Sequence, residues 1–234
     1  MGLSCTHRTF LTLFLVFPTA FPIAQTSSSS SHSSQTGRKT AHADAVIDPG
    51  TVTDGVYRNK TFGFTCKIPP GWVLRTDEMN ARDGDEHANN TGTDSQAAPA
   101  PASIAGGKVL LAAFSRPPAA TGEDVNSSIL IAAESTSTYP GLKDVAQYFE
   151  PLTEVARAQG FSVDEEPYEI AIGTKTLVRG DFHKDVASRV MRQSTLAMLS
   201  HGYAVSFTVI GGTDDEVGDL IDGLDFGARP GVKK

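Results

Sequence analysis

The spacing of apolar residues predicts a β-sheet over most of the chain. Phe62, Phe64, Cys66 and Ile68 alternate with mostly polar residues, which is the two-residue period of a strand buried on one face. Other apolar runs are almost continuous, as in central strands covered on both faces. The expected strands are residues 62–68, 108–115, 127–134, 176–183, 189–199 and 203–210.

Two segments show helical periodicity instead. Apolar residues recur at helical spacing from Leu142 to Val155, and Pro151 within this segment predicts a kink or a restarted helix. The second segment opens with a capping box formed by Thr213 and Glu216. It continues as an apolar stripe at Val217, Leu220, Ile221 and Leu224.

The order of these elements predicts the fold class. The connections at residues 184–188 and 200–202 are short enough to indicate antiparallel hairpins. Strands joined in this way, with helices between and after them, predict an α+β domain. We expect a central antiparallel β-sheet of about six strands with helices packed on it, as a layered α/β/α sandwich.

Composition divides the chain into regions. Residues 1–24 read as a signal peptide because a short apolar run follows His7 and Arg8, and residues 25–51 form a polar, Ser-rich tether. The predicted domain spans residues 52–228 and is followed by a tail at residues 229–234. Within it, residues 77–107 are so polar that a disordered insertion is expected. These regions predict an exported protein, periplasmic or extracellular, with no transmembrane segment in the mature chain.

Charge and cysteine content narrow the classes of partner. The formal net charge is −7, which disfavours nucleic acid as a partner. Removal of the signal peptide would leave Cys66 as the one cysteine, so no internal disulfide is expected. Its phase with Phe62 and Phe64 predicts a buried, inert thiol, and a reactive thiol is the alternative.

One polar cluster is a candidate binding site. Arg179, Asp181 and His183 alternate on one predicted strand, and Arg189 and Arg192 lie on the next, so the five could hold an anionic ligand or a partner. A solvated sheet face is the alternative. The sequence shows none of the common short catalytic or metal-binding motifs, and no cofactor is predicted. The acidic residues of the predicted insertion lack the spacing of a calcium-binding loop.

The opening of the predicted domain resembles a known family. Tyr57 and Asn59, then Phe-Gly-Phe at residues 62–64 and Pro-Gly-Trp at residues 70–72, resemble the first strands of the PsbP-like (Mog/PsbP) fold. The resemblance extends to about residue 226, where the last predicted helix leads into Leu224, Asp225 and Phe226. It implies a non-enzymatic, accessory or binding role.

The sequence therefore predicts a non-catalytic exported domain that binds another envelope or secreted component, with a protein as the partner. One alternative is a carrier of a small molecule or ion, using a cleft between sheet and helix. Another is a hydrolase with a dispersed site that uses Asp181 and His183. No oligomeric state is predicted.

Overall fold

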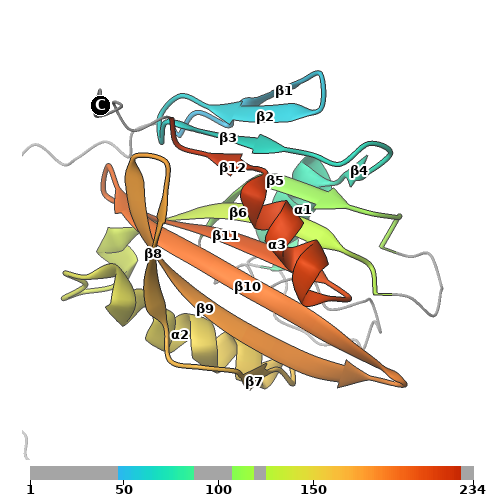
Figure 1. Cartoon of the computed structure of the whole chain (residues 1–234). Coiled ribbons are helices and arrows are strands. Elements are labelled where there is room, and N and C mark those ends of the chain that lie inside the picture. The colour runs from blue at the N-terminus through green and yellow to red at the C-terminus, as the bar shows by residue number, and fades with distance from the viewer. Residues whose placement is uncertain (1–46, 87–106, 119–124, 228–234) are drawn as a thin grey trace, which may run out of the picture. The chain divides into compact units, whose positions relative to one another are not determined.

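A computed structural model describes residues 47–86, 107–118 and 125–227 of the 234-residue chain (Figure 1). Strands and helices both occur in these ranges, and every strand pair in them is antiparallel. The predicted α+β class is therefore confirmed. The predicted signal peptide, most of the tether and the tail lie outside the described residues.

The larger sheet has eight strands in the described ranges, where the sequence predicted about six. The order is β4-β5-β6-β11-β10-β9-β7, and β8 also pairs with β9. Three of these strands were not predicted: β4 and β7 have two residues each, too few to show a period, and β8 has five. The bounds are β4 (Val73–Leu74), β5 (Lys108–Phe114), β6 (Ser128–Ser135), β7 (Ser162–Val163), β8 (Tyr168–Ile172), β9 (Lys175–Val186), β10 (Arg189–Ser200) and β11 (Tyr203–Gly211).

A second sheet corrects the expectation of a single one. Its order is β1-β2-β3-β12, with β1 (Thr51–Thr53), β2 (Val56–Asn59), β3 (Phe64–Lys67) and β12 (Leu224–Asp225). In it, β12 from the end of the chain pairs with β3 from its start, joining Leu224 to Cys66. The resulting layer buries Phe64 and Cys66, so the alternation seen in the sequence is real but belongs to a separate sheet.

The layers follow from which side chains pack together. Tyr148 and Phe149 of α2 (Val145–Ala158) pack against Val178, Ala197 and Ala204 on one face of the larger sheet. The other face is covered by α3 (Asp214–Asp222) and the second sheet, as Figure 1 shows. Apolar side chains of all three parts form one continuous core there.

Two residues of the opening motif, Tyr57 and Asn59, bind the backbone of residues 48–49 to the second sheet. The Tyr57 hydroxyl donates to the Pro49 carbonyl at 2.9 Å, and the Asn59 amide donates to the Asp48 carbonyl at 3.0 Å. The Asn59 side chain also accepts from the Phe62 backbone N–H at 2.9 Å. Asn59 is only 2% exposed, so these bonds satisfy a buried amide. The folded body therefore begins before residue 52, the start that composition predicted.

The two predicted helices are confirmed, with a change of boundary. Thr213 caps α3 by accepting from the Glu216 N–H at 3.1 Å. α2 starts at Val145, later than the apolar spacing suggested, because Asp144 forms its cap. It runs through Pro151 without restarting. Among the described residues, no helix is long and apolar enough to cross a membrane.

A third helix corrects part of the predicted insertion. α1 (Thr76–Glu86) occupies the first ten residues of the stretch expected to be disordered, and residues 87–106 lie outside the described ranges. Its side chains bond to β5. Asn80 donates to the Val109 carbonyl at 2.9 Å and accepts from the Val109 N–H at 3.0 Å, and Thr76 accepts from the Ala112 N–H at 3.0 Å. Composition missed this helix because polar side chains, more than apolar ones, attach it to the sheet.

Candidate functional site

The candidate site lies where β9 and β10 pass the start of α3. The strands pair so that Asp181 lies opposite Ser194, and His183 lies opposite Arg192. In this register Arg179, Asp181, His183 and Arg192 have the parity of the sheet face that α3 covers. Arg189, at the start of β10, has the opposite parity.

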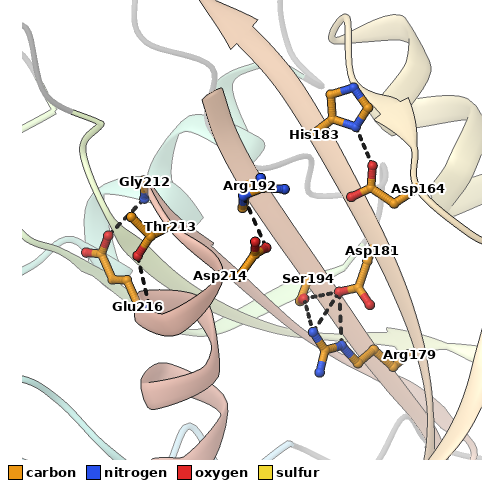
Figure 2. Close-up of polar contacts among 10 residues, drawn as sticks. All are labelled: Asp164, Arg179, Asp181, His183, Arg192, Ser194, Gly212, Thr213, Asp214 and Glu216. Carbon is orange, nitrogen blue, oxygen red and sulfur yellow. Dashed lines mark hydrogen bonds and ion pairs between the residues drawn. The ribbon is translucent and has the colours of Figure 1, made fainter. Parts of the chain in front are cut away.

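Asp181 is the shared hydrogen-bond acceptor of the first polar group, and Figure 2 shows it with Arg179 and Ser194. It accepts from Arg179 Nε at 2.9 Å and from the Tyr168 hydroxyl at 2.9 Å, and the Ser194 hydroxyl also donates to it. Arg179 Nη2 donates to Ser194 Oγ at 3.0 Å. Burial raises the pKa of the Tyr168 hydroxyl to about 12, and the neighbouring Asp181 carboxylate adds to this shift. These groups bind one another, and Ser194 is 1% exposed.

His183 belongs to a second, separate pair. Its Nδ1 bonds to the carboxylate of Asp164, which follows β7 (Figure 2). The two side chains are 38% and 34% exposed. The structure therefore pairs His183 with Asp164 and pairs Asp181 with Arg179, although the sequence had suggested Asp181 and His183 as one unit.

Arg192 connects β10 to the start of α3. Its Nε lies 3.1 Å from Asp214 Oδ1, and the side chains are 34% and 79% exposed. Just beyond, Glu216 accepts from the Gly212 N–H at 2.8 Å and from the Ser127 hydroxyl. The first turn of α3 is thereby held to the residue before β6 and to the residue after β11, next to the Arg192–Asp214 pair.

Two hollows adjoin these groups and share Arg192 and Asp214. The larger, of about 750 Å³, is lined by Arg116, Arg189 and Arg192 together with Asp214 and Glu216. The smaller, of about 270 Å³, is more acidic, and its charged lining residues are Asp164, Glu165, Asp181, Asp214, Arg179 and Arg192. Arg189 has the opposite strand parity from the other predicted residues. It nevertheless lines the larger hollow together with Arg192.

Sequence reasoning missed several members of this surface. Ser194 alternates with Arg192 on the same strand, and that signal was available. Asp164 follows the short strand β7, Tyr168 starts β8 and Arg116 follows β5, so only the tertiary fold brings them close. Among residues 47–86, 107–118 and 125–227, no group of three or more His, Cys, Asp or Glu side chains could hold a metal ion.

Two other predicted features have clear positions. Cys66 is fully buried on the apolar face of β3, so its predicted burial is confirmed, and burial raises the pKa of its thiol to about 12. The inert thiol stays a prediction. The carrier alternative needs a cleft between sheet and helix; at α2 the contact with the larger sheet is packed, with Tyr148 and Phe149 0% and 2% exposed against the strands.

Comparisons with known proteins give similar folds at low identity. No protein-family model matches the chain, and no curated protein sequence does. Among solved structures, LpqN of Mycobacterium tuberculosis, described as involved in cell envelope biogenesis, is 15% identical with a TM-score of 0.33. The match covers 75% of this chain and 80% of LpqN.

Two further solved structures match over similar lengths. The cyanobacterial PsbP protein CyanoP of Synechocystis is 12% identical, with a TM-score of 0.42, covering 72% of this chain and 89% of CyanoP. The Ran-binding protein Mog1p of Saccharomyces cerevisiae is 14% identical, with a TM-score of 0.33, and the match covers 71% of this chain and 80% of Mog1p. CyanoP is itself named as a PsbP protein, the family whose first strands the opening motif resembles.

Proposed function

We propose that this chain is a non-catalytic exported domain that binds a protein of the envelope or of the secreted fraction. We place the contact on the surface formed by β9, β10 and the start of α3. The observation that carries the proposal is the pairing of its polar groups. Asp181, Arg179 and Ser194 bind one another, whereas Arg192 and Asp214 stand together at the rim of two hollows.

This pairing argues against the hydrolase alternative. A serine nucleophile must reach its substrate and be activated by a neighbouring base. Ser194 is 1% exposed and bonds to Asp181 and Arg179, while the imidazole of His183 is engaged by Asp164. The cluster therefore holds β8, β9 and β10 together and supports the rim without supplying a reactive group.

Export is the second part of the proposal and rests on the sequence. The apolar run within residues 1–24 and the Ser-rich stretch after it are typical of a signal peptide and a tether. A sole buried cysteine in the folded body is compatible with an oxidising compartment, since it offers no accessible thiol there.

Affinity capture with a charge-reversed variant tests the function. The full-length chain serves as bait in host envelope and secreted fractions, beside Arg192→Glu and the matched control Arg157→Glu. Arg157 is an exposed arginine on α2, 58% exposed and paired only with its neighbour Glu154 among the contacts of the described residues. We expect one stoichiometric protein that is lost with Arg192→Glu and retained with Arg157→Glu. Equal capture by both variants would refute the proposed surface.

A further inference from the structure

Among the described strands that have a neighbour on one side only, β8 is the longest. It pairs with β9 alone and has five residues, whereas the other border strands, β1, β4, β7 and β12, have two or three. Folded proteins usually keep border strands short, because their unpaired backbone groups can pair with another chain. The length of β8 therefore makes its outer edge the candidate for accepting a further strand.

The register of β8 on β9 shows which backbone groups point away from the sheet. Ile172 and the first residue of β9 close a two-residue turn and therefore form a hydrogen-bonded pair. The Asp164 N–H donates to the Asp181 carbonyl at 2.9 Å, so the odd-numbered residues of β9 bond toward this side. Bonded pairs alternate along antiparallel strands, so the N–H and C=O groups of Glu169 and Ala171 face outward. Both residues are exposed, and no hydrogen bond among the described residues reaches these outward groups.

β8 is an ordered strand and not a loose end. Ile170 and Ile172 pack against the core, and the Tyr168 hydroxyl donates to Asp181 at 2.9 Å. Within the strand there is no proline, no lysine and no shift of register, which are common ways of protecting a border strand. A firmly held strand with free backbone groups on one side is the arrangement that accepts an added strand.

Two copies of β8 match each other in an antiparallel register centred on Ile170. Outward-facing residues must pair with outward-facing residues, so Glu169 can lie opposite either Glu169 or Ala171 of a second copy. The first choice places like charges directly opposite, which is unfavourable. A register centred on Ala171 would pair fewer residues, because the turn follows Ile172. The register centred on Ile170 places each Glu169 opposite an Ala171, pairs all five residues and uses the same patch on both copies, as a two-fold dimer requires.

We propose that the outer edge of β8 pairs with β8 of a second copy of this chain, so that the larger sheets of the two copies become one continuous antiparallel sheet. Each Glu169–Ala171 pair exchanges two backbone hydrogen bonds across the two-fold axis. This inference goes beyond the binding function proposed above, because the occupant is a second copy and not the partner protein. A strand edge buries little area, so the dimer is weak and forms reversibly as the concentration of the chain rises.

Sedimentation equilibrium of the full-length chain, extended towards millimolar concentration, tests the inference with three substitutions at one exposed position. Ala171→Lys places a lysine opposite each Glu169 and should tighten dimerisation about fivefold, whereas Ala171→Glu places like charges there and should weaken it about fivefold. Ala171→Pro removes an outward N–H that β9 does not use and should weaken dimerisation about tenfold or more. Every variant keeps the rest of the chain, so association through any other segment would be unchanged.

Val52→Lys and Val52→Glu are matched controls, because Val52 is 42% exposed on β1, a border strand of the other sheet. Both should leave the dimerisation constant unchanged, and circular dichroism melts check that each variant is folded. Equal dimerisation constants for folded Ala171→Lys and Ala171→Glu would overturn the inference. A chain that stays monomeric throughout, also as Ala171→Lys, would overturn it too and would leave the edge unpaired or open to a strand of another protein.

Discussion

Tyr148→Phe tests a buried polar cluster on the α2 side of the larger sheet. Glu134 on β6 is 3% exposed and accepts from the Tyr148 hydroxyl at 2.7 Å and from the Tyr139 hydroxyl. Tyr148 itself is 0% exposed. Removing its hydroxyl leaves one Glu134 oxygen without that donor in a region that water does not reach.

The expected cost follows from the charge state of Glu134. A hydrogen bond to a charged group contributes about 1.5–3 kcal/mol, and a neutral one about 1 kcal/mol. We therefore expect Tyr148→Phe to lower the free energy of unfolding by about 2 kcal/mol near neutral pH. In a Glu134→Gln background, where the acceptor is always neutral, the same change should cost about 1 kcal/mol.

The pH dependence of stability gives an independent test of the buried Glu134. Burial raises the pKa of Glu134 above its ordinary value, so between its unfolded-state and folded-state pKa values the folded chain binds more protons than the unfolded chain. This contribution is fully present below the unfolded-state pKa and is lost as pH rises through the folded-state pKa. Relative to Glu134→Gln, the wild-type chain should therefore lose stability as pH rises through that window.

Urea unfolding followed by the fluorescence of Trp72, the single tryptophan, measures these effects at several pH values. A cost below about 0.5 kcal/mol for Tyr148→Phe, together with the same pH slope in wild type and Glu134→Gln, would refute this reasoning.

Two further predictions concern the second sheet. Asn59→Ala removes two donated hydrogen bonds, to the Asp48 carbonyl and the Tyr57 hydroxyl, and one accepted from the Phe62 N–H. Urea unfolding should therefore show that the free energy of unfolding falls by about 2–3 kcal/mol. A fall of less than about 1 kcal/mol would contradict the anchoring role of Asn59. In a Cys5→Ser background, Cys66 should react with a thiol reagent at least about a hundredfold more slowly in the folded chain than in the unfolded chain, because the thiol is buried and its pKa is raised to about 12. Equal rates in the two states would show that the thiol is accessible.

Much of the fold was predictable because long strands and capped helices leave local signals. The strands β5, β6, β9, β10 and β11 appeared as apolar runs, and Thr213 with Glu216 marked the start of α3. The second sheet was not predictable as a separate layer. Its closing strand β12 has two residues and finds its partner β3 only through the tertiary fold.

The candidate site was predictable only in part, for a similar reason. Alternation along β9 placed Arg179, Asp181 and His183 on one face, and the hairpin placed Arg192 beside them. Periodicity carries no information about which of these side chains pair. His183 and Arg192 belong to separate contacts because Asp164, just after β7, pairs with His183, and Asp214 of α3 pairs with Arg192.

Site-specific photocrosslinking in the host tests the central claim most directly. A photoreactive amino acid replaces Val190, which lines the larger hollow, and in a matched control it replaces Glu154, which is 70% exposed on α2. The proposed binding surface predicts a single protein adduct from position 190 and none from position 154. Adducts from position 154 alone would contradict it and would place the partner on the α2 face of the sheet.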